Sequence, residues 1–212
     1  APVTASRHIT EKYKRYLRTI FKIADQDYAC QFEIALADES AFASGPYLDV
    51  NVSFVKGRSI RDLLEIGVLS PGFERIDIPY TRPLYKHQET AVEKSCGGAN
   101  IVVSTGTGSG KTESFLLPVF DSLLRELQAG TLSPGVRALI IYPMNALAND
   151  QVERLRKVLA HIPEITFGSY TGQTRLKYAD ALADYRLLNE NQVPIANELI
   201  SREQILDQPP HI

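Results

Sequence analysis

One octapeptide constrains the fold of this chain more than any other feature of its sequence. Residues 105–112 read Thr-Gly-Thr-Gly-Ser-Gly-Lys-Thr and separate a short apolar run, 100–104, from an amphipathic run that begins at Lys111. Glycine has no Cβ, so the backbone N–H groups of such a segment can turn inward around an anion. A loop of this kind between a strand and a helix is typical of α/β proteins that hold a phosphate at a helix N-terminus.

The sequence after residue 83 alternates between short apolar runs and longer amphipathic runs. This periodicity predicts helices over 86–95, 111–127, 145–159 and about 175–189, and buried strands over 100–104, 137–142 and 165–167. Gly130 is expected to end the helix that begins at Lys111. Buried strands that alternate with helices indicate βαβ units, so the predicted fold class is α/β, with a parallel sheet flanked by helices.

The earlier part of the chain shows a different pattern. Alternating apolar side chains over 47–55 predict a strand, and a Ser/Asp capping box at 59–62 predicts a short helix. Prolines and a glycine then interrupt any periodicity over 68–82. We therefore expect a small mixed α/β region over residues 1–80 and a second domain over residues 81–212.

The segment 10–23 combines helical spacing of aromatic and apolar side chains with a local excess of positive charge. Its cationic side chains, opposed only by Glu11, are Arg7, Lys12, Lys14, Arg15, Arg18 and Lys22. Two interpretations remain open. Tyr13 and Tyr16 could form part of a face for nucleic acid or for a protein partner. Alternatively, the aromatic side chains could turn into the core while the charges form a solvated face.

Composition limits the partners and the compartment. The net charge of the 212 residues is −2, so nucleic-acid binding would need a local basic patch. No apolar run approaches the ~18 residues that span a bilayer, and the N-terminus lacks the hydrophobic stretch of a secretory signal. Cys30 and Cys96 cannot form a disulfide framework or a four-ligand zinc site, so we expect isolated core thiols in a reducing cytoplasm.

The side chains of the octapeptide match the needs of a nucleoside triphosphate with Mg²⁺. Lys111 can place a positive charge at the β- and γ-phosphates, and the Thr112 hydroxyl can ligate Mg²⁺. Thr105 stands where the usual pattern has glycine, which leaves the rest of the loop geometry intact. The expected nucleotide-binding residues of this segment, called the phosphate loop below, are Thr105, Gly106, Thr107, Gly108, Ser109, Gly110, Lys111 and Thr112.

Four ordered motifs resemble those of a known family. Residues 107–112 look like motif I of the DEAD/DEAH-box helicases of superfamily 2. Residues 84–88, Leu-Tyr-Lys-His-Gln, are similar to the Q motif of that family, and residues 142–151 resemble its motif Ia. Residues 169–174 resemble the Thr-Gly segment that follows. The resemblance covers residues 81–212 and is nearest to large bacterial helicases of DNA repair and phage defence.

The resemblance implies an ATP-dependent helicase or translocase built on a RecA-like domain. ATP and Mg²⁺ would be its cofactors, Lys111 and Thr112 its catalytic residues, and nucleic acid its partner, DNA in preference to RNA. No Asp-Glu-x-Asp or Asp-Glu-x-His sequence occurs in residues 1–212. We therefore expect the N-terminal part of a longer helicase, truncated before the DEAD/DEAH motif and the second RecA-like domain, that does not hydrolyse ATP by itself.

Two residues before the phosphate loop are candidates for contact with the base. The Gln88 amide has a donor side and an acceptor side, which can match the N6/N7 edge of adenine. Tyr85 can stack on the base or lie in the core. Glu113 receives no role, because the helix dipole favours an acid in the first turn in any case. Three cations are interpreted as a solvated helix face: Arg154, Arg156 and Lys157.

Two further segments are candidates for contact with the phosphates of a nucleic acid. Residues 143–147 follow the C-terminal end of a predicted strand, where Asn145 can cap the next helix and expose N–H groups to a phosphate, or act as a cap alone. Residues 171–172 offer a hydroxyl and an unhindered backbone to a phosphate, or form a plain turn. The candidate nucleic-acid-binding residues are Pro143, Met144, Asn145, Thr171 and Gly172.

Two other classes of protein remain as alternatives. A phosphate-loop kinase or switch ATPase that does not act on nucleic acid would need neither residues 84–88 nor residues 142–151. A scaffold that binds a protein partner through residues 1–80 would have no use for the intact Lys111 and Thr112.

Overall fold

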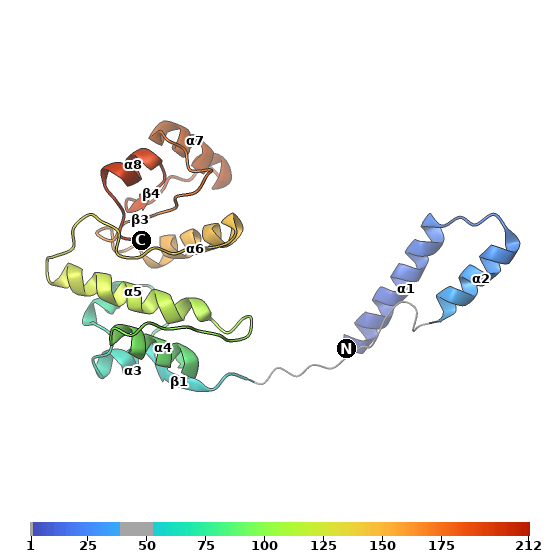
Figure 1. Cartoon of the computed structure of the whole chain (residues 1–212), viewed down its shortest axis with the longest axis horizontal. Coiled ribbons are helices and arrows are strands. Elements are labelled where there is room, and N and C mark those ends of the chain that lie inside the picture. Colours follow the sequence, from blue (N-terminus) through green and yellow to red (C-terminus); the bar gives the residue numbers. More distant parts are fainter. Residues whose placement is uncertain (1, 39–52) are drawn as a thin grey trace. The chain divides into compact units, whose positions relative to one another are not determined.

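The computed structural model describes residues 2–38 and 53–212, and Figure 1 shows the whole chain. Contacts divide the chain into two compact units, Ala1–Ser53 and Phe54–Ile212. The division falls before the boundary expected at residue 80, because apolar side chains between residues 54 and 80 pack into the core of the second unit.

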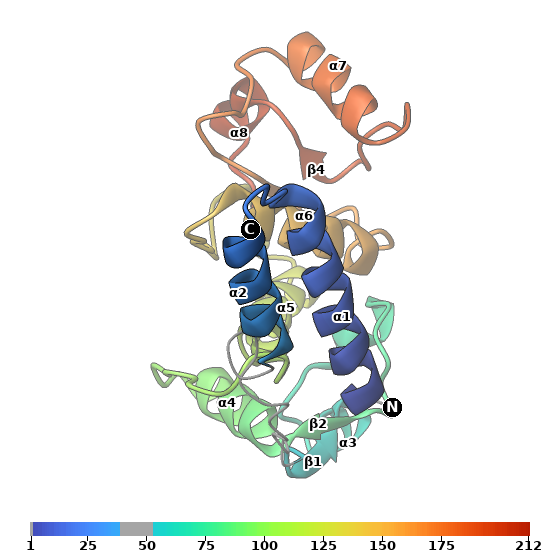
Figure 2. The same ribbon diagram turned by 90° about the vertical axis from the view of Figure 1, so that its right-hand side faces the viewer.

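The described part of the first unit is a helical hairpin. α1 (Pro2–Ile20) and α2 (Gln26–Ala37) lie side by side in both ribbon views (Figures 1 and 2). Asp25 caps α2 by accepting hydrogen bonds from two backbone N–H groups. Arg18 pairs with Glu33 across the hairpin, with Nε and Oε1 2.9 Å apart. The hairpin is thus tied by its turn and by one ion pair.

The tyrosines of α1 are not in the core. Tyr13 and Tyr16 are 48% and 56% exposed, and their rings stack with centroids 6.3 Å apart. Of the two interpretations, the one that turns these aromatic side chains into the core is therefore wrong, because α2 packs on a different face of α1, the face that carries Arg18.

A two-stranded antiparallel sheet opens the second unit. β1 (Lys56–Ser59) pairs with β2 (Pro83–Tyr85). The strand expected over 47–55 lies outside the described residues except for residues 53–55, which form no regular element. β2 ends at Tyr85, and the next helix begins directly at Lys86, where the candidate site also begins.

The predicted capping box is confirmed. α3 (Ile60–Glu65) begins after Ser59, whose Oγ accepts a hydrogen bond from Asp62 N at 3.2 Å. The Asp62 carboxylate accepts in return from Ser59 N at 2.7 Å. Two backbone donors at the helix start are thereby satisfied by side chains. A short 3-10 helix, η2 (Pro71–Arg75), follows.

The core of the second unit lies around α5 (Lys111–Gln128). Figure 1 shows α5 between α4 (Lys86–Cys96) and α6 (Asn145–Val158). All three helices confirm the sequence predictions, and Gly130, with φ of +68°, follows α5 as expected. Several elements contribute fully buried side chains: Leu63, Leu69, Phe73, Leu84, Leu123, Leu124, Leu159 and Ile162. Burying each is worth about 1.5–3 kcal/mol, which holds α5 against the rest of the core.

The C-terminal part contains a second, parallel sheet of two short strands. β3 (Phe167–Gly168) pairs with β4 (Glu198–Leu199), and the neighbouring helices are α7 (Tyr178–Leu188) and α8 (Arg202–Asp207). α7 and the strand near residue 167 agree with the sequence patterns, whereas no pattern predicted α8 or β4. Residues 209–212 extend this region, since their backbone bonds both to residues 135–138 and to residues 166–168.

Two apolar runs expected to be strands are not strands in the structure. Residues 100–104 and 137–142 form no ladder, and Val102, Leu139 and Ile141 are 96%, 79% and 82% exposed. A strand forms only where a neighbouring strand pairs with its backbone N–H and C=O groups. Of these runs, only Arg137 and Ala138 bond to another segment, both to His211 O. The described residues are therefore α/β with small sheets.

The expected core thiols are corrected by the structure. Cys30 and Cys96 are both exposed, because α2 and the end of α4 turn these positions outward. Shielding of the Cys96 thiol, together with the nearby Asp121 carboxylate, nevertheless raises its pKa to about 11. The described residues contain no helix long and apolar enough to cross a bilayer, and no cluster of side chains suited to a metal ion.

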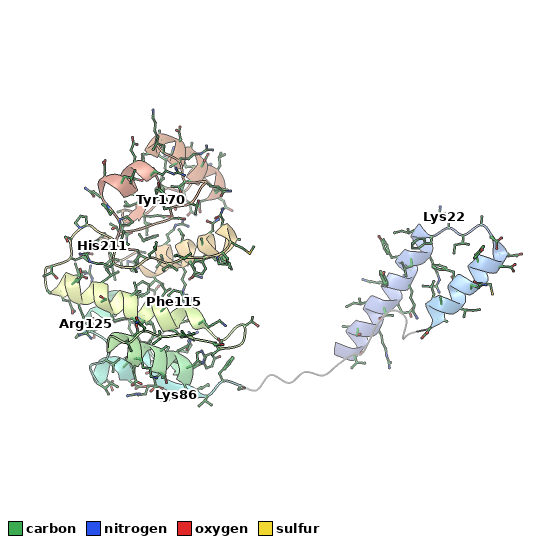
Figure 3. All side chains as sticks on the ribbon, viewed as in Figure 1. Lys22, Lys86, Phe115, Arg125, Tyr170 and His211 are labelled. Atoms are coloured by element: carbon green, nitrogen blue, oxygen red, sulfur yellow. The ribbon has the colours of Figure 1, made fainter. Side chains whose placement is uncertain are left out.

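His211 ties the segment 209–212 to its neighbours as a neutral imidazole. Its Nδ1 accepts a hydrogen bond from Thr166 N at 2.9 Å, so Nε2 carries the proton and donates to Ser133 O at 3.2 Å. Burial lowers the pKa of His211 below its ordinary value of 6.5. Figure 3 labels this residue beside the C-terminal end of the chain.

We expect acid to destabilise the second unit through His211. The unfolded state takes up a proton near pH 6.5 and the folded state does so only at lower pH, so stability falls as pH drops below about 6.5. The slope contributed is at most ~1.4 kcal/mol per pH unit. Urea unfolding at pH 8 to 5 should show this loss, and His211→Gln, which keeps a donor and an acceptor, should reduce it. An identical pH dependence in both proteins would contradict the prediction.

Candidate nucleotide and nucleic-acid site

Glycine conformations shape the phosphate loop (residues 105–112) at the start of α5. Gly108 and Gly110 have φ values of +73° and +70°, and Gly110 is the N-cap of α5. The N–H groups of residues 106–110 donate no hydrogen bond within the described parts of the chain. The loop therefore presents free backbone donors at the positive end of the α5 dipole, which suits an anion.

Lys111 lies over the loop. Its Nζ donates to Thr105 O at 2.8 Å and to Gly106 O at 2.7 Å, which leaves one of its three N–H donors available. Thr105 Oγ1 is 2.6 Å from Ser109 Oγ, and Ser109 is buried. This hydroxyl pair accounts for a threonine where the usual pattern has glycine, since the side chain closes the loop on itself.

The start of α4 braces the loop from one side. His87 Nε2 lies 3.0 Å from Ser109 O, and Gln88 Nε2 donates to Gly110 O at 2.7 Å. Gln88 Oε1 accepts from Tyr85 N at 2.7 Å, and the Gln88 side chain is 2% exposed. The structure thus brings residues 84–88, which resemble the Q motif, into contact with the phosphate loop. Both the donor side and the acceptor side of the Gln88 amide, however, already have protein partners.

We expect Gln88→Ala to weaken the binding of ATP and GTP about equally. The alanine leaves the Gly110 carbonyl without its donor and frees the loop, and neither effect depends on the base. Calorimetric titration of the parent chain and the variant with each nucleotide measures the ratio of the ATP and GTP affinities. A narrowing of the ATP-over-GTP preference by about 1–3 kcal/mol would contradict this expectation and would show that the amide reads adenine.

Tyr85 belongs to a small aromatic group at the loop. Its ring stacks on His87 at 5.7 Å and contacts Phe54 at 5.2 Å, and the side chain is half-buried. A Cβ on Gly106 would lie 4.0 Å from the Phe54 ring. Sequence reasoning assigned nothing to Phe54 or His87. The position of His87 beside Gln88 in the sequence could have indicated its place at the loop. Phe54 belongs to no motif, so nothing in the sequence indicated its place.

Sequence reasoning also missed Glu113. Its carboxylate pairs with Arg154 at 2.9 Å and lies 3.5 Å from Arg82, so the helix dipole is not its only partner. The interpretation of Arg154 as part of a solvated face is therefore wrong. The partners come from segments far apart in the sequence, and no local spacing reveals them.

Arg156 is likewise not a solvated charge. It makes a two-pronged ion pair with Glu198, at 2.8 and 2.7 Å, and the Glu198 side chain is 3% exposed. Lys157 differs, since it pairs only with the exposed Glu153 one turn away. Of the three cations, only Lys157 fits the sequence interpretation, because the other two face acids carried on different elements.

The candidate phosphate contact at the start of α6 is exposed. The N-cap of α6 is Met144, 62% exposed, and Asn145 is the first helical residue, without a side-chain cap bond. The expectation that Asn145 caps the helix is therefore wrong, because the helix begins one residue earlier. The first N–H groups of α6 remain without a side-chain acceptor, which leaves them available to an anion.

Residues Thr171 and Gly172 form a closed turn. Thr171 N donates to Thr174 Oγ1 at 2.9 Å, and Arg202 Nη2 donates to Thr171 O at 3.1 Å. The Arg202 guanidinium also lies over the ring of Tyr170, 5.2 Å from its centroid, and Figure 3 labels Tyr170 in this region. In the described residues, no hydrogen bond joins this turn or Pro143, Met144 and Asn145 to the phosphate loop.

Comparison with known proteins places these features in one family. The sequence model of the DEAD/DEAH box helicases matches residues 85–207, more than half of the chain. The Druantia protein DruE of Escherichia coli is 32% identical over 188 residues, covering 79% of this chain and 10% of that protein. The ATP-dependent helicase hrq1 of Schizosaccharomyces pombe is 31% identical over 101 residues, covering 46% of this chain and 9% of that protein.

An uncharacterized ATP-dependent helicase of Methanocaldococcus jannaschii, MJ1574, is 41% identical over 71 residues, covering 34% of this chain and 9% of that protein. The chain thus spans about a tenth of the length of these curated relatives. No solved structure matches it. The resemblance inferred from the four sequence motifs is confirmed, and the matched domain implies a RecA-like α/β fold, of which the described residues show helices and two small sheets. The chain belongs to the DEAD/DEAH box helicase family.

Proposed function

We propose that this chain is the ATP-binding part of an ATP-dependent helicase or translocase that acts on nucleic acid. The observation that carries the proposal is the phosphate loop, whose free N–H groups and Lys111 ammonium converge at the N-terminus of α5. Helix dipole, backbone donors and a point charge all favour the same polyanion. The match to the DEAD/DEAH box family and the relatives named ATP-dependent helicases support ATP as that ligand.

The residues present also fit Mg²⁺ as a companion of the nucleotide. Thr112 is half-buried beside Lys111, and within the described residues its hydroxyl makes no hydrogen bond. A hydroxyl together with phosphate oxygens is the hard oxygen donor set that Mg²⁺ prefers. Thr112 would hold the ion, which supplies charge neutralisation at the phosphates, while Lys111 and the loop N–H groups orient them.

Titration calorimetry of the 212-residue chain with ATP and Mg²⁺ tests this proposal directly. Binding that weakens when Mg²⁺ is removed is expected. Binding of a nucleoside without phosphates at equal strength would contradict the phosphate loop as the main determinant.

We further propose that nucleic acid contacts the start of α6 and the turn at Thr171 and Gly172. Support comes from the uncapped N–H groups at Asn145 and from the open space around Gly172, where an added Cβ would meet nothing within 4 Å. We propose DNA rather than RNA as the substrate. The chain would act as part of a longer chain with a second RecA-like domain. Its role would be phage defence or DNA repair in the cytoplasm. Fluorescence anisotropy with single-stranded DNA and RNA of one sequence distinguishes the two.

The exposed side of α1 is a second proposed contact, for nucleic acid or for a protein partner. Lys12 and Arg15 have no ion pair among the described residues, and Lys12 and Tyr16 are one turn apart on the helix. Each lost phosphate contact lowers the salt slope of single-strand binding by about 0.7. Replacing both cations by alanine should therefore lower it by about 1.4, and an unchanged slope would favour a protein partner instead.

We also propose that residues 100–104 and 137–142, which are not paired as strands in this structure, can pair in solution to form the parallel sheet expected under the phosphate loop. Support comes from their apolar side chains, including Val102, Leu139 and Ile141, which such a sheet would bury. Amide hydrogen exchange tests this, since strand pairing predicts slow exchange over both runs. Exchange at the rate of an unpaired chain would contradict it.

A further inference from the structure

Glu113 joins three segments of the second unit at the start of α5. Its Oε1 accepts from Arg154 Nη2 at 2.9 Å and lies 3.5 Å from Arg82 Nη2, and its Oε2 lies 3.4 Å from Gln88 Nε2. The side chain is 16% exposed. An acid that merely met the helix dipole would need none of these partners, because the dipole acts on any carboxylate in the first turn.

Glu113 and Gln88 both press against the N-cap of α5. A Cβ on Gly110 would lie 2.4 Å from Gln88 Nε2 and 3.0 Å from Glu113 Oε2. The Gly110 carbonyl also accepts the 2.7 Å hydrogen bond from Gln88. Since the left-handed conformation of Gly110 sets the direction of the preceding N–H groups, these two side chains control where the loop donors point.

Arg154 connects this cluster to α6. It has no other ion-pair partner in the described residues, and the pair borders a cavity of about 40 Å³ whose lining includes Leu84 and Leu116. An apolar wall reduces screening, so this pair is stronger than one on an open surface. α6 begins at Asn145, the proposed nucleic-acid contact. The contacts of Glu113 and Arg154 therefore connect the phosphate loop to the helix that carries this second part of the proposed site.

We propose that Glu113 is a positioning residue through which Arg154 of α6 and Gln88 of α4 hold the phosphate loop in its ATP-binding conformation. The inference rests on the proposed ATP-binding function. It assigns a specific task to Glu113, which lies outside the phosphate loop, and it makes α6 a structural support of the proposed nucleotide site.

Simple electrostatics predicts the opposite effect of removing this carboxylate. ATP is a polyanion, so the loss of a negative charge near its phosphates should tighten binding if Glu113 acted only as a charge. A positioning role predicts weaker binding, because the loop donors lose their fixed direction. The sign of the change therefore separates the two explanations.

The experiment compares ATP affinity, by titration calorimetry of the 212-residue chain, among Glu113→Gln, Glu113→Asp, Arg154→Gln and the Glu113→Gln/Arg154→Gln double variant. Lys157→Gln is the control, since it removes a cation and an exposed ion pair from the same helix. We expect each single variant to bind ATP about tenfold more weakly, the double variant no more weakly than the singles, and the control to bind normally. Aspartate keeps the charge and the dipole interaction but lacks the reach, so it should fail like glutamine.

Unchanged or tighter binding by Glu113→Gln, normal binding by Glu113→Asp, or additive losses in the double variant would each overturn the proposal. Amide exchange at residues 106–110 without nucleotide provides a readout that does not depend on ATP. Faster exchange than in the Lys157→Gln control is expected for Glu113→Gln and Arg154→Gln. If the parent chain binds no ATP, the proposed function fails, while equal exchange in the variants and the control overturns the positioning role itself. Thermal unfolding of each variant identifies any loss of the fold.

Discussion

Lys111→Ala is expected to lower ATP affinity by about tenfold to a hundredfold. A hydrogen bond to a charged group contributes about 1.5–3 kcal/mol, and each 1.4 kcal/mol is a factor of ten in the dissociation constant. The fold should survive, because among the described residues the Lys111 ammonium bonds only to carbonyls of the loop itself, Thr105 O and Gly106 O. Titration calorimetry with ATP and Mg²⁺ measures the effect.

The matched control for this variant is Lys157→Ala. Lys157 is also a helical lysine, its side chain is 73% exposed, and its ion pair with Glu153 lies one turn away on α6. Both variants remove one positive charge, so any general electrostatic attraction of ATP is lowered similarly in both. Equal ATP binding by the Lys111 variant and the parent chain would mean that the phosphates do not lie at this loop.

Arg156→Ala is expected to destabilise the second unit by about 3 kcal/mol. Removal of one partner of a buried ion pair leaves the other charge uncompensated, which typically costs about 3–5 kcal/mol. Glu198 is that partner, with a side chain 3% exposed, and the partial exposure of Arg156, 23%, places the expected value at the lower end. Urea unfolding followed by circular dichroism measures the loss.

A second variant separates the charge effect from lost packing. Arg156→Ala combined with Glu198→Gln removes both charges, so it should be more stable than Arg156→Ala alone. The Tyr185 hydroxyl can still donate to the amide oxygen, as it donates to Glu198 now at 3.2 Å. Burial together with the Glu198 charge raises the pKa of Tyr185 to about 12, which keeps it a donor at neutral pH. A cost below about 1 kcal/mol for Arg156→Ala would show that the pair behaves like an exposed one.

The site could be predicted from the sequence only where its chemistry is local. The phosphate loop is one continuous octapeptide, and Lys111 bonds to carbonyls of residues that are its neighbours in the chain. Glu113, by contrast, owes its surroundings to Arg82, Gln88 and Arg154, which reach it from other elements. No spacing of residues in the sequence predicts these contacts.

The role of Gln88 illustrates the same limit. Its position before the loop predicted a place at the proposed nucleotide site, and in the structure it bonds to the loop at Gly110 O. The partners of its amide, Tyr85 N and Gly110 O, follow from the packing of α4 against α5, which the motif alone does not specify. These partners favour a bracing role for Gln88 over direct contact with adenine. The ratio of ATP affinity to GTP affinity in Gln88→Ala tests the two roles.

By itself, the sequence determined the family, the phosphate loop, the helices and the Ser59–Asp62 capping box, because each depends on side chains within a few residues of one another. The tertiary structure alone decided which apolar runs are paired and which charges are buried. Val102 and Leu139 are as apolar as any core residue and are exposed, while Glu198 is charged and buried against Arg156. Strand pairing and charge burial need partners brought from distant parts of the chain, and only the packing of whole elements supplies them.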